Sequence, residues 1–155
     1  MNVKKLINRY KLVPHPEGGY YREIYRSEQI LLSPAAGKKR SALTHIYFLL
    51  TKGQVSRFHR IVHDEVWNFY EGDPLRLLQY DGNNISAALI GVAGGDFVSV
   101  VKGGIYQAAE TTGAYSLVGC TVAPGFDFED FSFLSDDPEL KQRLIENYPD
   151  SRRLL

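Results

Sequence analysis

The sequence contains very little cysteine: among its 155 residues there is one, Cys120, inside the apolar run SLVGCTVA. A single thiol cannot form an intrachain disulfide, which excludes a disulfide-stapled fold and favours a reducing compartment. Because a free cysteine in an apolar run packs as a small hydrophobe, we expect Cys120 to be buried and inert.

An excess of either charge is also missing, since 18 Lys and Arg residues balance 18 Asp and Glu residues. This balance lacks the basic footprint of nucleic-acid-binding proteins. No apolar window approaches the ~20 residues of a membrane-spanning helix. The first thirteen residues lack the apolar core and small-residue cleavage site of a secretory signal. We therefore expect no nucleic-acid or membrane partner and a cytoplasmic location.

What the chain does contain is ordinary for a globular protein, with 44% hydrophobic and 23% charged residues. Its length predicts one domain over residues 1–155. Segments with a period near two, rich in Val, Ile, Tyr, Phe and Thr, alternate with short turn signals, which is typical of an antiparallel sandwich or barrel. The predicted strands are Tyr20–Leu32, Ala42–Leu50, Gln54–Arg60, Glu65–Tyr70, Leu75–Tyr80, Ile85–Ile90, Phe97–Val101, Ile105–Glu110 and Tyr115–Thr121.

Helical patterns occur only near the two ends of the chain. The apolar spacing in Val3–Tyr10 predicts a short helix. Near the C-terminus, Asp137 is the predicted N-cap of a second helix, Pro138 fits its first position, and Pro149 ends it. Between the first helix and the first strand, LVPHPEGGYY has two prolines and two glycines and is predicted to be a structured loop.

The stretch GQVSRFHRIVHDEVWNFYEG, from Gly53 to Gly72, carries chemically active residues at a defined spacing. His59 follows Gly53 after five residues, and Glu65 lies six positions after His59. This spacing resembles the first motif of the cupin superfamily, whose members are small β-barrels that commonly hold a metal or a sugar-like ligand. The resemblance implies that His59 and Glu65 point into the barrel.

Two of the four positions that bind metal in cupins hold other residues here. Ile61 stands where the motif has its second histidine, and Gln107, in KGGIYQ, stands where the family has its last histidine. An aliphatic side chain and an amide are poor ligands for Fe, Mn, Ni or Zn. We therefore expect neither a metal nor any other cofactor. If a metal did bind, the resemblance and strand parity would assign it to His59, Glu65, Gln107 and His63.

Three longer phrases narrow the resemblance: PHPEGGYYREIYRS, DEVWNFYEGDPL and YSLVGCTVAPGFDFEDF. Together they are similar to an uncharacterised cupin subfamily, a domain of unknown function, over nearly the whole chain. The resemblance implies an all-β fold: an antiparallel double-stranded β-helix, the cupin jelly-roll barrel, with a short N-terminal helix and a C-terminal helix. It further implies a fold similar to dTDP-4-dehydrorhamnose 3,5-epimerase, and a homodimer.

These patterns give a set of candidate site residues. His59 is the predicted catalytic base, and Glu65 the catalytic carboxylate that orients it, since a neighbouring carboxylate fixes the tautomer of an imidazole. Arg22 could hold a phosphate or carboxylate through its forked donors. The predicted ligand-binding residues are Ile61, Trp67, Gln107, Tyr47 and Arg22, with Tyr47 or Tyr106 as a source of a phenolic acid.

The sequence leaves open whether the chain is an enzyme. One hypothesis is a metal-independent epimerase or isomerase that acts on a small polar ligand of the sugar or nucleotide-sugar class. The alternatives are a non-catalytic module that binds a small molecule, and a metal-dependent cupin enzyme. For the subunit arrangement, the predicted edge strand with Tyr20, Tyr21 and Tyr25 favours a homodimer, because exposed sheet edges are usually covered.

Overall fold

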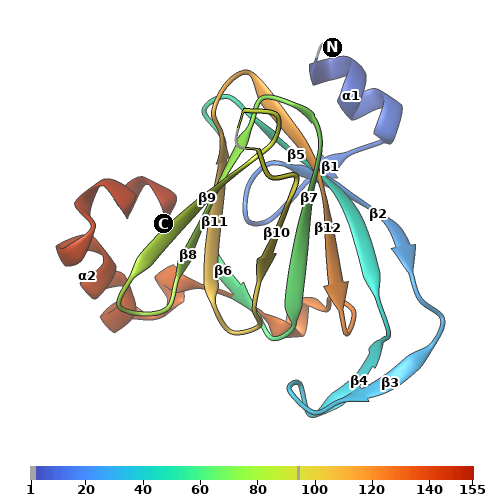
Figure 1. Cartoon of the computed structure of the whole chain (residues 1–155). Helices are drawn as coiled ribbons and strands as arrows, with labels where there is room; N and C mark the ends of the chain where they lie inside the picture. Colours follow the sequence, from blue (N-terminus) through green and yellow to red (C-terminus); the bar gives the residue numbers. More distant parts are fainter. Residues whose placement is uncertain (1–2, 94) are drawn as a thin grey trace.

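Two antiparallel β-sheets form the body of the protein in the computed structural model, which describes residues 3–93 and 95–155 (Figure 1). The six-stranded sheet has the order β1 (Val13–Pro14), β2 (Tyr20–Arg26), β5 (Thr44–Thr51), β12 (Tyr115–Ala123), β7 (Asp64–Gly72), β10 (Val98–Val101). The five-stranded sheet has the order β13 (Phe131–Phe133), β6 (Val55–Ile61), β11 (Tyr106–Thr111), β8 (Leu75–Tyr80), β9 (Ile85–Ile90). This arrangement confirms the predicted antiparallel cupin jelly-roll fold.

The main hydrophobic core lies between the two sheets. Phe48 and Trp67 come from the six-stranded sheet, and Leu75, Leu77 and Ala109 come from the five-stranded one. In β7, the buried residues Glu65, Trp67 and Phe69 alternate with more exposed ones, as expected for a strand with one buried face. Each fully buried large apolar side chain contributes roughly 1.5–3 kcal/mol, so this layer holds the two walls of the barrel together.

Helices cover the outer faces of both sheets. Helix α1 (Val3–Tyr10) packs Leu6 against Leu49 and Leu117 of the six-stranded sheet. Helix α2 (Pro138–Asn147) packs Leu144 against Phe58 of the five-stranded sheet. The chain also forms three short 3-10 helices: η1 (Phe128–Asp130), η2 (Leu134–Asp136) and η3 (Pro149–Leu154). No helix among residues 3–93 and 95–155 is long and apolar enough to cross a membrane.

The C-terminal helix begins and ends as the sequence predicts. The side chain of Asp137 accepts a hydrogen bond from the backbone N–H of Leu140 at 3.0 Å, and Pro138 occupies the first helical position. The helix ends at Asn147, before Pro149. The N-cap therefore satisfies one of the donors that a helix start leaves open.

The first predicted strand, Tyr20–Leu32, is wrong as a single element. Strand β2 ends at Arg26, and after Ser27–Gln29 the chain forms β3 (Ile30–Ser33), which pairs with β4 (Lys38–Ser41). This hairpin extends beyond the ends of β2 and β5 (Figure 1). The sequence also gave no signal for β1, β4 or β13, which are two to four residues long and too short for a period to show.

Candidate functional site

A cavity of about 550 Å³ opens at one end of the space between the sheets. Its walls come from β2, β5 and β12 on one side, from β6 on the other, and from the residues around η1. Such a volume is typical of small-molecule sites. Its wall is largely apolar: Val13, Tyr21, Ile46, Ile61, Val122, Phe126, Phe128 and Phe131.

The loop between β1 and β2 enters this cavity because of its two glycines. Gly18 has φ +112°, and a Cβ there would lie 2.0 Å from the carbonyl oxygen of Val55 in β6. Gly19 has φ +74°, and a Cβ there would lie 2.7 Å from the carbonyl oxygen of Leu49 in β5. Only glycine fits both the backbone conformation and the space. The two glycines therefore let the loop lie against both sheets and carry Glu17 into the cavity wall.

Glu17 makes the closest contact with the predicted base. Its Oε2 lies 3.0 Å from Nε2 of His59, and its Oε1 accepts a hydrogen bond from Oγ of Ser56 at 2.8 Å. Its carbonyl accepts from the backbone N–H of Arg57 at 2.9 Å, so main chain and side chain are both held. The side chains of Glu17 and His59 are only 8% and 3% exposed. Glu17 is not among the site residues predicted from the sequence.

Hydrogen bonds and burial determine where the protons of this pair lie. His59 Nδ1 lies 2.7 Å from the carbonyl oxygen of Arg57, which can only accept, so Nδ1 carries the hydrogen. Burial lowers the pKa of His59 and raises the pKa of Glu17 to about 8. Both groups are therefore neutral at pH 7. The protonated Glu17 carboxyl donates to the lone pair on Nε2 of His59.

His15 adds a second histidine to the cavity wall. Its Nδ1 accepts a hydrogen bond from the backbone N–H of Glu17 at 3.1 Å. Burial, with a smaller contribution from His59, lowers the pKa of His15 to about 3, so the ring is neutral and its hydrogen lies on Nε2. Within residues 3–93 and 95–155, Nε2 has no hydrogen-bond acceptor. This N–H is available to a ligand.

Glu65 lies in β7 of the six-stranded sheet and also lines the cavity. Its Oε2 accepts a hydrogen bond from Gln107, whose Oε1 accepts from Nε1 of Trp67 at 2.8 Å. Burial raises the pKa of Glu65 to about 7, although His59 and the Gln107 and Cys120 hydrogen bonds lower it. The site thus holds two buried carboxyl groups that titrate near neutrality, one on each wall.

Cys120 is buried, as expected, and its thiol lies in the cavity wall beside Glu65. Burial and the neighbouring carboxyl group raise the pKa of this thiol well above its ordinary value. The group is therefore a protonated thiol at neutral pH and a poor nucleophile.

Lys11 lies at the rim of the cavity and has an unusual backbone conformation. Its φ is +52°, and it ends helix α1 with two C-terminal hydrogen bonds: Lys11 N–H to the Asn8 carbonyl at 3.3 Å and Leu12 N–H to the Ile7 carbonyl at 3.0 Å. This bonding pattern normally has glycine at the left-handed position. A side chain there costs roughly 1–2 kcal/mol.

Arg22 lies at the same rim and donates to the carbonyl oxygen of Tyr10 at 3.3 Å. The neighbouring Arg26 is already occupied, because it donates twice to the carboxylate of Glu23, at 2.9 and 2.8 Å, and once to the carbonyl of Phe126 at 3.0 Å. Arg22 and Lys11 have no carboxylate partner in the described part of the chain.

Of the residues predicted from sequence, His59, Glu65, Ile61 and Arg22 line the cavity. Gln107 lies directly behind Glu65, and Trp67 lies behind Gln107 in the core.

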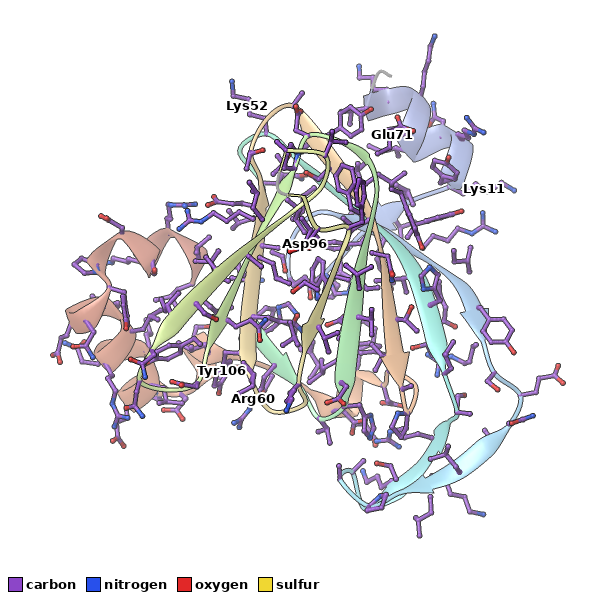
Figure 2. The ribbon with its side chains drawn as sticks, in the orientation of Figure 1. Lys11, Lys52, Arg60, Glu71, Asp96 and Tyr106 are labelled. Atoms are coloured by element: carbon purple, nitrogen blue, oxygen red, sulfur yellow. The ribbon has the colours of Figure 1, made fainter. Side chains whose placement is uncertain are left out.

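Two predicted tyrosines lie elsewhere. The ring of Tyr47 is outside the barrel, with its centre 4.8 Å from Tyr10 and 5.9 Å from Tyr70. Tyr106 packs in the core beneath α2, and the guanidinium of Arg60 covers its ring (Figure 2). Placing Tyr47 in the pocket was wrong, because strand β5 directs its odd-numbered residues away from the barrel interior, whereas Phe48 points inward.

His63 does not join His59 and Glu65. It lies in the turn between β6 and β7, where strand parity no longer determines side-chain direction. Its Nε2 lies 2.6 Å from Oγ of Ser33, and its Nδ1 lies 3.8 Å from Oδ2 of Asp130. Arg40 donates twice to Asp130 at 2.8 Å. This cluster connects the β3–β4 hairpin to the barrel and is separate from the cavity.

Comparison with known proteins agrees with this architecture. Residues 4–134 match the family described as Cupin superfamily (DUF985). The chain belongs to this cupin family. It is 30% identical over 158 residues to the uncharacterized protein YML079W of Saccharomyces cerevisiae, spanning 90% of this chain and 79% of that one.

Two solved structures resemble this cupin along almost its whole length. One is a hypothetical protein from Leishmania major, with 33% identity and a TM-score of 0.84; the other is protein SO0799 from Shewanella oneidensis, with 34% identity and a TM-score of 0.84. Each likeness covers 99% of this chain and 97% of the other. These structural matches support the family membership and the fold of the chain. They do not indicate an activity.

The metal centre that the cupin family implies does not fit the residues of this chain. Ile61 offers no donor atom, and Gln107 is already hydrogen-bonded to Glu65 and Trp67. Nε2 of His59, which a metal would need, lies against Glu17. Within residues 3–93 and 95–155 no group of three or more His, Cys, Asp or Glu side chains could hold a metal ion. We therefore assign no chemical step at this cavity to a metal.

Sequence reasoning missed His15 and Glu17, which contribute much of the polar chemistry of the cavity. The available signal was the diglycine that follows them, because two adjacent glycines allow a loop to approach other backbone closely. The sequence pattern predicted only a turn at Gly18 and Gly19. In the structure this turn also places the carboxyl group of Glu17 beside His59.

Proposed function

We propose that this cupin is a metal-independent acid–base catalyst of the isomerase or epimerase type, acting on a small polar carbonyl compound of the sugar class. The observation that carries the proposal is the buried Glu17–His59 pair, 3.0 Å apart, in a cavity that also contains Glu65. Buried titratable groups with pKa values near neutrality in one cavity are characteristic of acid–base sites.

The pKa values suggest which group is the base. Glu65, whose pKa burial raises to about 7, has an ionised form at neutral pH that can take a proton from the carbon next to a carbonyl. Glu17, with a pKa of about 8, still holds its proton and can donate it. This assignment follows the rule that different environments separate the roles of paired carboxyl groups.

The proposed reaction balances without any oxidant or reductant. Glu65 removes the proton, and the electron pair of the C–H bond forms an enolate, whose oxygen accepts a hydrogen bond from Nε2–H of His15. Glu17 then donates its proton to the same carbon from the opposite side, which inverts the centre. For isomerisation the proton goes instead to the other carbon of the enediolate, and the hydroxyl proton on the first carbon's oxygen moves to the enolate oxygen, so the carbonyl moves to the first carbon. Proton exchange with solvent restores both carboxyl groups.

His59 has a different role in this proposal from the one predicted from sequence. Both of its ring nitrogens have partners, Arg57 O and Glu17 Oε2, so His59 accepts the hydrogen bond that Glu17 must release when it gives its proton to a substrate. We therefore assign His59 as the residue that positions Glu17 and holds its proton. Epimerisation of a nucleotide sugar remains one member of the proposed reaction class.

A second candidate function is a binding module without chemistry. The observation that favours it is the internal pairing of three polar side chains: His59, Gln107 and Trp67 all have hydrogen-bond partners within the protein. Such a network can serve only to shape a rigid polar pocket.

Exchange of carbon-bound hydrogen with D₂O, followed by NMR, tests the catalytic proposal. The substrates are aldoses and ketoses, each as the free sugar and as its phosphate. We expect the wild type to exchange the hydrogen next to the carbonyl of at least one of them, and Glu17→Gln and Glu65→Gln to be slower by at least ~100-fold. Glu139→Gln, a change at an exposed carboxylate on α2, is the matched control.

The outcomes separate the two functions. Saturable binding without exchange would establish the binding module and reject the catalyst. Neither binding nor exchange with the whole panel would reject both proposals.

We also propose that the chain functions as a homodimer. Strand β1 pairs only with Tyr20 and Tyr21, which leaves Arg22–Arg26 of β2 as a sheet edge. Near this edge Tyr25 is 55% exposed, and on the β3–β4 hairpin Ile30 and Leu32 are 60% and 67% exposed. An antiparallel edge matches a copy of itself related by a two-fold axis, and the zero net charge adds no overall repulsion between copies.

A further inference from the structure

Two positive side chains at the rim of the cavity are not used by the proposed reaction. Lys11 directly follows helix α1, Arg22 of β2 donates to the carbonyl of the last helical residue, Tyr10, and both line the cavity. Their neighbours Arg26 and Glu23 neutralise each other through two hydrogen bonds. Asp127, the remaining acidic residue at the entrance, accepts a hydrogen bond from the backbone N–H of Glu129 at 2.9 Å.

The conformation of Lys11 gives an independent reason to look for a role for its side chain. At a left-handed helix end, glycine would be the more stable choice, yet this chain has lysine there, at φ +52°. Residues other than glycine in a left-handed conformation cluster at functional sites. Arg22, whose guanidinium lies at the same helix end, has donors beyond the single 3.3 Å bond to Tyr10.

We infer that Lys11 and Arg22 form an anion-binding rim, so that the ligand reaching Glu17 and Glu65 carries a carboxylate or phosphate group. This inference rests on the proposed function in one respect: the proposed reaction places the reacting carbon of the ligand at Glu17 and Glu65. Arginine binds such groups through paired donors, and lysine adds a point charge. The apolar wall between rim and base accommodates the uncharged part of the ligand.

NMR titration of ¹⁵N-labelled protein with two probes, inorganic phosphate and acetate, tests the rim directly. Sodium chloride at matched ionic strength is the reference. We expect saturable shifts of the Lys11 and Arg22 amide signals with at least one probe, and the stronger probe identifies phosphate or carboxylate as the preferred group. Shifts no larger than those with chloride would overturn the inference.

Lys11→Gly is the decisive variant, because glycine relieves the backbone conformation while removing the charge. We expect a Tm equal to or above that of the wild type, and at least ~10-fold weaker binding of the preferred anion, as for loss of a charge-assisted contact. Lys52→Gln removes the same charge from the loop after β5, distant from Lys11 (Figure 2), and should bind normally. Unchanged binding by Lys11→Gly would overturn the inference.

Arg22→Gln and His59→Asn complete the design. Arg22→Gln should also weaken anion binding at least ~10-fold, since it removes the forked donor group. His59→Asn should still bind the anion, because His59 is not at the rim.

If the rim binds anions but no substrate exchanges hydrogen, the catalytic proposal fails and the rim inference stands. If exchange occurs and the rim binds no anion, only the rim inference fails.

Discussion

At the scale of single residues, the site depends on burying a carboxyl group that water would otherwise ionise. Glu17 has little exposure, and its main compensation is the hydrogen bonds to Ser56 and His59. A buried carboxylate without a full countercharge is costly, so the group keeps its proton instead. The protein thereby stores a proton beside the cavity at neutral pH.

This protonation makes stability depend on pH. The pKa of Glu17 is raised from 4.5 in the unfolded chain to about 8 in the folded protein, so the folded state binds the extra proton between these values. Stability is then greatest below pH 4.5 for this group and is lost as the pH rises to 8. Between pH 5.5 and 8, we expect Glu17 to lower the free energy of unfolding by roughly 1–3 kcal/mol.

Urea denaturation of the wild type and Glu17→Gln at pH 5.5 and pH 8 measures this effect. The amide can still accept from Ser56 and can donate to Nε2 of His59, so the variant should fold. We expect the wild type to lose more stability than the variant between the two pH values. Parallel losses in both proteins would show that Glu17 is not the group that retains the proton.

At the scale of elements, the loop between β1 and β2 is the part of the fold that builds the site. It lies against the backbone of β5 and of β6, which belong to different sheets, and two glycines make both approaches possible. Any side chain at Gly18 would displace the loop and withdraw Glu17 from His59.

Gly18→Ala tests this dependence. The new methyl group would lie 2.0 Å from the Val55 carbonyl, so we expect a loss of roughly 3 kcal/mol or more in the free energy of unfolding and loss of ligand binding. Gly53→Ala is the control: Gly53 has φ +83° but no atom within 4 Å of its Cβ position. It should lose only about 1–2 kcal/mol, measured by urea denaturation. Equal losses of unfolding free energy in the two variants would show that the close approach of Gly18 to the Val55 carbonyl does not affect stability.

At the scale of the whole molecule, the β3–β4 hairpin is a separate two-stranded sheet beside the two sheets of the barrel. A two-stranded hairpin is marginally stable alone in water, and this one is attached to the barrel by Ser33–His63, next to its turn, and by Arg40–Asp130. Its exposed Ile30 and Leu32 are the reason to expect a second copy of the chain to cover it.

Light scattering after size-exclusion chromatography tests the dimer. We expect the wild type to have twice the 17.5 kDa mass of the chain. The double variant Ile30→Ser, Leu32→Ser should dissociate at a concentration at least ~10-fold higher, because it removes apolar area that the interface would bury. Val92→Ser changes an equally apolar residue that is 77% exposed on a different loop and should leave the mass unchanged. A monomeric wild type would contradict the proposal.

Sequence periodicity predicted the long elements well, because alternation reports which face of a strand is buried. The strands Leu75–Tyr80 and Ile85–Ile90 have the predicted bounds, and α2 has the predicted cap. The resemblance of Gly53–Gly72 to the cupin motif implied that His59 and Glu65 face one cavity, and both line it. Each of these features depends on residues a few positions apart, so the local pattern contains the information.

The tertiary structure alone decided the partners in the site. Glu17 and His59 are 42 positions apart, and no periodicity connects a loop with a strand of the opposite sheet. The same is true of Lys11 and Arg22, which line one cavity only because α1 ends beside β2. The sequence by itself determined a cupin barrel with a histidine and a glutamate facing inward. Long-range packing decided which buried groups share a proton, because protonation depends on burial and on neighbours that only the folded chain brings together.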